Sequence, residues 1–203
     1  MFGKKEQSKD TFLHRKLGPT LASVVLFILE VTQIVIISAA IILPIRFFLI
    51  QPFYVKGESM EPNFYDNEYL IIDEISYRFR EPERGEIVVF RYPRNPSEFF
   101  IKRVVGLPGE TIEISDGRVT VINEDFPDGR SIDEPYTLND FTAGSKRVVL
   151  NPDEYFVLGD NRDASYDSRR FGPIRKDAIV GRVWVRGLPL TKINLFDAPD
   201  YNL

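Results

Sequence analysis

The chain has 203 residues but no cysteine and a single histidine. Without cysteine it cannot use disulfides, thiol nucleophiles, thiolate zinc sites or iron–sulfur clusters. Basic residues are also too few for a nucleic-acid partner, because the net charge of −4 at pH 7 leaves no excess to neutralise phosphates. The length leaves room for one domain of roughly 150 residues and a short appendage, which argues against a two-domain cofactor enzyme. We expect neither a cofactor nor a bound metal ion.

A long apolar run follows a basic N-terminal segment. Residues 1–19 hold five basic and two acidic side chains, a local charge of +3, whereas residues 20–49 are almost continuously apolar. About 20 apolar residues cross a hydrocarbon core of ~30 Å, so we expect a transmembrane helix over 20–49. A buried core helix and a removable secretory signal are the alternatives. Ser38-Ala39-Ala40 imitates a signal cleavage site, but the apolar run continues beyond it and favours a permanent anchor.

The charges on the two sides of this run predict its orientation. No basic cluster comparable to that of residues 1–19 follows the run, and the positive-inside rule therefore places the N-terminus in the cytoplasm. We expect a single-pass protein of the plasma membrane with a cytoplasmic segment 1–19 and an extracytoplasmic domain from residue 50. Glu30 lies inside the run, where a carboxylate facing lipid is costly. It is a candidate contact with a partner helix, or it lies close to the interface.

The remainder of the chain is rich in short β-type segments separated by turn residues such as Leu107-Pro108-Gly109 and Asp116-Gly117. No long stretch after residue 50 has a helical period. We therefore expect a mainly β fold, with an antiparallel domain over 50–190 and a loose C-terminal tail over 191–203. The expected strands are 69–72, 87–91, 99–105, 111–114, 119–122, 147–150, 155–158 and 179–185.

The position of the only histidine restricts the chemistry of the exported domain. His14 precedes the apolar run, so it lies on the other side of the bilayer. A Ser-His-Asp triad and a histidine-bound zinc are both excluded from the domain. A hydrolase built on this domain needs Lys, Asp, Glu or an N-terminal amine as its base, which directs attention to serine paired with lysine.

Ser59 is the first candidate, in a turn bounded by Gly57 and Pro62. Such a turn can expose a hydroxyl and point backbone N–H groups at an oxyanion. An ordinary turn serine is the alternative. Ser59 follows the apolar run by only about ten residues, so a substrate associated with the membrane is expected.

Lys102 is the second candidate. Alternation along a strand places Lys102 and Arg103 on opposite faces, so one of these two cations lies among apolar neighbours. Desolvation lowers the pKa of a lysine, whereas an arginine stays charged, and a neutral Lys102 can act as a general base. The alternative is an edge-strand lysine that opposes aggregation.

The third feature is a dense polar block over residues 159–172, directly after the expected strand 155–158. Its many short polar side chains are suited to a local hydrogen-bond network that orients a catalytic pair. A calcium-binding loop or a purely structural loop is equally compatible with the block alone.

Together and in this order after an apolar span, the three segments resemble the motifs of bacterial type I signal peptidases, membrane-bound serine proteases that remove signal peptides from exported proteins. The segments are GESMEP (57–62), FFIKRVVGLPGE (99–110) and GDNRDASYDSR (159–169), and the resemblance covers about residues 15–187. It implies a β-rich domain of the signal peptidase/LexA-like type, with Ser59 as nucleophile and Lys102 as general base. It also implies that Ser165 hydrogen-bonds the lysine. The supporting residues that it implies are Met60, Pro62, Arg103, Asp160, Arg162, Asp167 and Arg169.

The chain departs from this pattern at a few positions. Many members carry a serine oxyanion donor where this chain has Gly57, so the resemblance is to a glycine-bearing branch, with the oxyanion bound mainly by the Ser59 N–H and aided by the Gly57 backbone. Asn63 replaces a common threonine and Glu110 a common aspartate. Residues of about 113–150 correspond to the variable insert of the family.

The implied mechanism agrees with the list of possible bases. Neutral Lys102 takes the proton of Ser59, the hydroxyl attacks the carbonyl at the signal-peptide junction, and water hydrolyses the acyl-enzyme. The implied partners are preprotein signal peptides with Ala-x-Ala sites, docked as an extended strand, and the lipid bilayer. A Ser-Lys processing peptidase with a dedicated substrate and an inactive membrane-anchored binding module are the alternatives.

Overall fold

The computed structural model describes residues 19–44, 51–199, 201 and 203. The chain divides into two units, residues 1–47 and 48–203, which are described separately. The described part of the first unit is helix α2 (Pro19–Pro44). Within it, Ser23–Leu43 has a mean hydropathy of 2.5 and is long and apolar enough to cross a membrane. The helix is thereby confirmed over 20–44, whereas residues 1–18, with His14, and 45–49 lie outside the described residues.

The apolar side chains of α2 are exposed within its unit. Phe27 and Ile34 are each more than three-fifths exposed. A helix that is apolar on all sides is suited to cross a membrane by its length and composition. Glu30 is also exposed on this helix.

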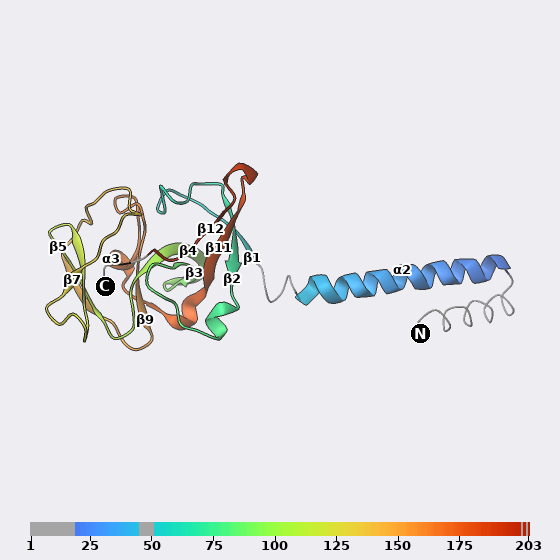
Figure 1. The fold of residues 1–203 in the computed structure, drawn as a ribbon, viewed down its shortest axis with the longest axis horizontal. Helices are drawn as coiled ribbons and strands as arrows, with labels where there is room; N and C mark the ends of the chain where they lie inside the picture. The colour runs from blue at the N-terminus through green and yellow to red at the C-terminus, as the bar shows by residue number, and fades with distance from the viewer. Residues whose placement is uncertain (1–18, 45–50, 200, 202) are drawn as a thin grey trace. The chain divides into compact units, whose positions relative to one another are not determined.

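The second unit consists almost entirely of antiparallel strands (Figure 1). Its short helical elements are α3 (Ser168–Phe171) and the 3₁₀ turns η2 (Ser76–Arg78), η3 (Lys176–Ala178) and η4 (Leu190–Lys192). Its strands are β1 (Gln51–Tyr54), β2 (Tyr69–Asp73), β3 (Ile87–Tyr92), β4 (Asn95–Gly106), β5 (Thr111–Ser115), β6 (Arg118–Ile122), β7 (Arg130–Ser131), β8 (Lys146–Val149), β9 (Glu154–Leu158), β10 (Ile174–Arg175), β11 (Ile179–Leu188) and β12 (Asn194–Leu195).

Two sheets are formed. The larger has the order β1-β2-β11-β3-β4-β9-β10, with β12 paired to β11, and the smaller has the order β7-β6-β5-β8. Every pairing is antiparallel. The mainly β prediction is confirmed, and each of the eight expected strands is present. The strands of the smaller sheet lie between residues 111 and 149, largely within the segment 113–150.

The larger sheet is buried on both faces at its centre. In β3, four consecutive residues from Ile87 are buried, and they alternate between two apolar clusters. Val89 belongs to the cluster around Met60 and Phe64, whereas Val88 and Phe90 belong to the cluster around Tyr155. Because successive strand residues point to opposite faces, β3 and its neighbour β4 present side chains to two separate layers.

The C-terminal tail is not loose, and the expectation for 191–203 is wrong for part of it. Asn194 and Leu195 form β12 on β11, and the ring of Phe196 lies 4.4 Å from that of Phe64, centroid to centroid. Tyr201 packs against the core cluster of the smaller sheet. Single aromatic side chains anchor this segment, and isolated anchors produce no periodic pattern in the sequence.

Candidate active site

A tight turn after β1 carries Ser59. Gly57 has φ +91°, and a Cβ added there meets no atom within 4 Å. The glycine is therefore required by the backbone conformation and not by close packing. Met60 is buried in the core, and its carbonyl oxygen accepts hydrogen bonds from the N–H groups of Asn63 (3.0 Å) and Phe64 (2.9 Å). Pro62 lies exposed on the same turn. Met60 thus anchors the turn while Ser59 stays half-buried.

The loop after β9 holds the turn from the other side. The Asn161 N–H donates to the Ser59 carbonyl oxygen at 3.1 Å. Gly159 makes this approach possible, because a Cβ there comes within 2.5 Å of the same carbonyl oxygen and 2.3 Å of Ser165 Oγ. Only glycine fits at this point. The first and third motifs therefore touch directly.

Lys102 reaches Ser59 from the middle of β4, where it pairs with Val88. Its side chain is buried, and Nζ donates to Ser59 Oγ at 2.8 Å and to the Ile101 carbonyl oxygen at 2.7 Å. Burial lowers the pKa of Lys102 to about 8, against the opposing charges of Asp167 and Asp160. A base with this pKa is partly neutral at physiological pH and lies within reach of the hydroxyl proton.

Arg103 points to the opposite face of β4 and is also buried. It binds Asp160 through two hydrogen bonds, Nε to Oδ1 at 2.8 Å and Nη2 to Oδ2 at 2.7 Å, and its Nη1 donates to the Gly85 carbonyl oxygen. Burial acts to lower the pKa of Arg103, but Asp160 outweighs it and raises that pKa. The sequence predicts burial for one of the two cations, and the structure buries both.

The polar block 159–172 contains a largely buried network of charged side chains. Arg169 binds Asp167 through Nε and Nη2, each at 2.8 Å, and its Nη2 also donates to the Arg162 carbonyl oxygen. Burial acts to raise the pKa of Asp167, but Arg169 outweighs it and holds that pKa below its ordinary value. Asp167 also caps α3 by accepting from the Arg169 N–H. Among the described residues, no group of three or more His, Asp or Glu side chains is arranged to hold a metal ion.

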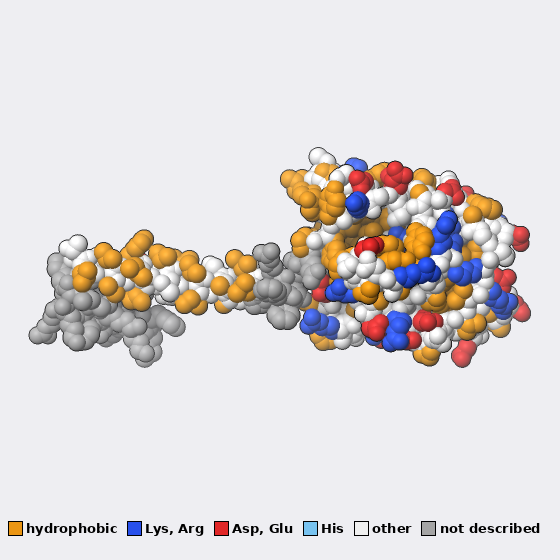
Figure 2. Space-filling model, turned by 180° about the vertical axis from the view of Figure 1, so that it is seen from behind, with side chains coloured by type: hydrophobic (Ala, Val, Ile, Leu, Met, Phe, Trp, Pro, Cys, Tyr) orange, Lys and Arg blue, Asp and Glu red, His pale blue; other side chains and the backbone are white. Residues whose placement is uncertain are grey.

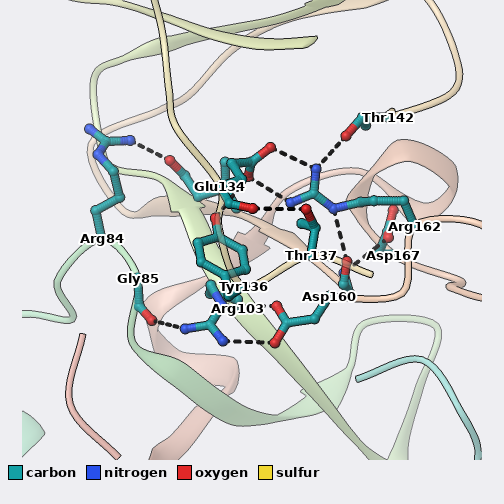
Figure 3. Close-up of polar contacts among 12 residues, drawn as sticks. Arg84, Gly85, Arg103, Glu134, Tyr136, Thr137, Thr142, Asp160, Arg162 and Asp167 are labelled. Atoms are coloured by element: carbon teal, nitrogen blue, oxygen red, sulfur yellow. Dashed lines mark hydrogen bonds and ion pairs between the residues drawn. The ribbon is translucent and has the colours of Figure 1, made fainter. Parts of the chain in front are cut away.

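Arg162 forms its ion pair with a residue outside the block 159–172. Its two terminal nitrogens bind both carboxylate oxygens of Glu134, at 2.8 and 2.6 Å, and one of them also donates to Thr142 (Figure 3). Glu134 and Thr142 belong to the segment 113–150 and were not among the expected site residues. A lone Glu in an irregular loop has no spacing signal in the sequence that links it to Arg162.

Two expected contacts differ from the structure. The Gly57 N–H does not face the cleft as an oxyanion donor, because it donates to Asp66 Oδ1 at 2.8 Å. The Ser165 hydroxyl is buried and is not bonded to Lys102, whose Nζ donates to Ser59 and to the Ile101 carbonyl. It lies instead beside Asp167 and helps to lower the pKa of that carboxyl. The Ser59 N–H has no acceptor among the described residues and is the donor left for an oxyanion.

A cleft of about 530 Å³ opens over Ser59 and Lys102. Its size is typical of ligand sites. Figure 2 shows hydrophobic side chains gathered in a hollow on one face of the molecule, with charged side chains around it. The cleft has mostly apolar walls contributed by β1, β2, β3, β4 and the residue after β1; these walls include Phe53, Val55, Leu70, Val89, Phe99 and Ile101.

Unpaired backbone groups along the cleft are also available to an extended peptide. Strand β1 pairs only with β2, and the part of β4 that precedes Arg103 pairs only with β3 among the described residues. Both strands line the cleft and leave unpaired N–H and C=O groups along it. A peptide in extended form can add to such an edge.

The chain is similar in sequence to known proteins over most of its length. The family model "Signal peptidase, peptidase S26" matches residues 28–187. A probable signal peptidase I-2 from Synechocystis sp. is 38% identical over 172 residues, covering 82% of this chain and 76% of that protein. Signal peptidase IB from Staphylococcus aureus is 36% identical over 188 residues, covering 81% of this chain and 94% of that protein. A crystal structure of a signal peptidase I from Enterococcus faecalis V583 is 30% identical and covers 51% of this chain and 97% of that one, with a TM-score of 0.43.

The resemblance drawn from the three motifs is thereby confirmed, because the model of one family spans the motifs and relatives above 30% identity cover about four-fifths of the chain. The chain belongs to the signal peptidase family, peptidase S26.

Proposed function

We propose that this chain is a membrane-anchored serine endopeptidase that removes signal peptides from preproteins with a Ser59–Lys102 dyad. The observation that carries the proposal is the contact of 2.8 Å between Lys102 Nζ and Ser59 Oγ, made by a lysine that is buried and whose pKa is lowered to about 8. Family membership supports the same reaction.

The reaction starts with proton transfer from Ser59 Oγ to neutral Lys102. The Oγ–carbon bond forms at the scissile carbonyl, and the Ser59 N–H stabilises the oxyanion. The carbon–nitrogen bond then breaks, and the Lys102 ammonium returns its proton to the leaving amine. Water attacks the resulting ester, Lys102 takes a proton from it, and that proton finally restores the Ser59 hydroxyl.

The cleft supports a preference for small side chains next to the cut, as in Ala-x-Ala. Its apolar walls accept short aliphatic groups of an extended peptide, and the free edges of β1 and β4 hold the peptide backbone. Lys56, Glu58 and Glu98 also line the cleft and bring charge to its rim.

The dyad is tested with detergent-solubilised protein and a preprotein that carries an Ala-x-Ala site. Ser59→Ala and Lys102→Ala are expected to abolish cleavage at that site, whereas Ser97→Ala, at an exposed serine outside the cleft, is expected to cleave as wild type does. Persistent cleavage by Ser59→Ala contradicts the dyad. No cleavage by folded wild type contradicts the general signal-peptide substrate.

We further propose a single pass through the plasma membrane with the N-terminus in the cytoplasm, supported by the charge of residues 1–19 and by the apolar helix α2. Because the chain has no cysteine, single cysteines can report sidedness. In intact cells, a membrane-impermeant maleimide is expected to label Ser97→Cys and not Gln7→Cys. The reverse pattern contradicts the orientation.

A further inference from the structure

The side chain of Asn63, four residues after the nucleophile, bridges two other parts of the site. Its amide nitrogen donates to Asp160 Oδ2 and to the Tyr136 carbonyl oxygen, both at 2.8 Å. An amide nitrogen carries two hydrogens, so both donors are used. The main-chain carbonyl oxygen of Asn63 in turn accepts a hydrogen bond from Arg186 Nη1 at 2.9 Å. Asn63 is thus fixed by side chain and main chain together.

This bridge fastens the Ser59 turn to the loop after β9 at a second point. The first point is the hydrogen bond from the Asn161 N–H to the Ser59 carbonyl oxygen, and the second joins Asn63 to the neighbouring Asp160. Asp160 is the same carboxylate that holds Arg103. A threonine at position 63 has a single hydroxyl proton and can donate to only one of the two acceptors.

Tyr136 connects this bridge to Arg103 from the segment 113–150. Its ring centroid lies 4.0 Å from Arg103 Cζ, and Figure 3 shows the ring lying over the guanidinium, with Asp160 and Gly85 on either side of that group. A guanidinium over a phenol ring is attracted to its face. The Tyr136 hydroxyl donates to Glu134 Oε1 at 2.7 Å and accepts from the Tyr201 hydroxyl at 2.9 Å.

We infer that Asn63 and Tyr136 are positioning residues, which hold the Ser59 turn in register with the Arg103–Asp160 pair and so with Lys102, the neighbour of Arg103 in β4. The inference rests on the proposed Ser59–Lys102 site. Neither residue lines the cleft, so their loss changes the alignment of Ser59 and not the binding of the peptide. On this inference the segment 113–150 helps to position the active site, through Tyr136.

The test measures kcat and KM of the full chain in detergent on the same preprotein, together with its thermal unfolding. Asn63→Leu removes both donors at nearly constant volume and is expected to lower kcat on the order of 10- to 100-fold with KM unchanged, as misaligned reacting groups do. Asn63→Thr keeps one donor and is expected to recover part of kcat. Tyr136→Leu is expected to lower kcat, whereas Tyr136→Phe keeps the ring over Arg103 and the carbonyl acceptor and is expected to stay close to wild type.

Phe126→Leu is the matched control, since Phe126 also packs under an arginine, Arg130, in the same segment but away from the site. The inference is overturned if folded Asn63→Leu keeps the wild-type kcat, if KM rises while kcat is unchanged, or if Tyr136→Leu loses no more kcat than Phe126→Leu. Should Asn63→Leu not fold, Asn63→Thr decides: a wild-type kcat contradicts the inference and a lower kcat at unchanged KM supports it. Ser59→Ala runs in parallel, and its retained cleavage overturns the dyad separately from the inference.

Discussion

Lys102 and Arg103 are adjacent in β4 and equally buried, each 4% exposed, but only Arg103 binds a carboxylate. Arg103 Nη2 lies 2.7 Å from Asp160 Oδ2, whereas Lys102 Nζ has the Ser59 hydroxyl and a backbone carbonyl as its hydrogen-bond partners. The pKa of Arg103 is therefore raised by its partner and that of Lys102 is lowered by burial. One strand thus supplies a permanent charge to the scaffold and a labile proton acceptor to the cleft.

The first prediction concerns the pH dependence of cleavage. Because only neutral Lys102 can take the Ser59 proton, kcat/KM is expected to rise with pH along an apparent pKa of about 8. Lys102→Arg keeps the charge at every accessible pH and is expected to be inactive throughout. The measurement is initial cleavage rate from about pH 6 to about pH 10, the range in which a lysine with this pKa titrates.

Removing the Asp167 charge tests the physical cause of the lowered Lys102 pKa. The Asp167 charge raises the pKa of Lys102 against the effect of burial. Asp167→Asn removes that charge and is expected to move the pH profile of the remaining activity to lower pH. A profile that stays in place or moves upward contradicts the assigned electrostatics.

The second prediction concerns stability. The pKa of Lys102 is about 8 in the folded chain and has an ordinary value of 10.5. Between these pH values the unfolded chain holds a proton that the folded chain lacks, so stability rises with pH by about 3 kcal/mol. Below pH 8 both states are protonated and the whole penalty of burying the charge is present. Lys102→Met removes this penalty, and its advantage in unfolding free energy over wild type is expected to shrink by about 3 kcal/mol between pH 8 and 10.5.

Chemical denaturation in detergent at several pH values provides the measurement. The hydrogen bonds that methionine loses shift the difference equally at every pH, so only its slope with pH is diagnostic. Lys56→Met, at an exposed lysine of the cleft rim, is measured in parallel as the control for introducing a methionine. A constant difference between Lys102→Met and wild type contradicts a lowered pKa.

The sequence predicts those parts of the fold that repeat. Residues Ile112 and Ile114 in β5, and Val119 and Val121 in β6, alternate with polar neighbours and are buried as the pattern indicates. In contrast, β7, β10 and β12 have two residues each, too few for any alternation. Their existence depends on the strands beside them.

The candidate site divides in the same way. The missing cysteines and the position of His14 directed attention to serine paired with lysine, and the resemblance of the three motifs then pointed to Ser59 and Lys102. The partners Asp66, Glu134 and Tyr136 were not found, because each lies in an irregular segment and meets its partner only after the chain has folded. The tail aromatics Phe196 and Tyr201 were missed for the same reason.

The third prediction concerns Gly57. Its φ of +91° is unfavourable for any residue with a Cβ, although there is space for one. Gly57→Ala is expected to strain the turn, at a cost of about 1–3 kcal/mol, and to move it away from Asp66 to relieve part of that strain. Because Ser59 follows two residues later, its hydroxyl then shifts relative to Lys102, and kcat is expected to fall.

Gly109→Ala is the matched control for Gly57→Ala. Gly109 has φ +80°, also without atoms within 4 Å of an added Cβ, and lies in the turn between β4 and β5. Both variants are expected to lose similar unfolding free energy, and only Gly57→Ala is expected to lose kcat. Equal kcat in the two variants contradicts a role of the Gly57 conformation in placing Ser59.

The fourth prediction concerns the ion pair between Arg162 and Glu134, whose side chains are 1% and 11% exposed. Glu134→Ala leaves a buried guanidinium without a carboxylate, and the expected loss of unfolding free energy is about 3–5 kcal/mol. The control is Glu113→Ala in the same segment. Glu113 binds Arg147 at 3.1 Å, but those side chains are 34% and 65% exposed, and such a pair contributes about 0–1 kcal/mol.

Denaturation of both variants in detergent compares the two pairs directly. A large loss for Glu134→Ala beside a small one for Glu113→Ala shows that the segment 113–150 holds the motif loop in place through Arg162. Because Arg162 Nε also donates to the Gly159 carbonyl oxygen, release of this arginine is expected to reach the point where Gly159 meets Ser59. Equal and small losses in the two variants contradict that coupling, since the loop then keeps its conformation without Glu134.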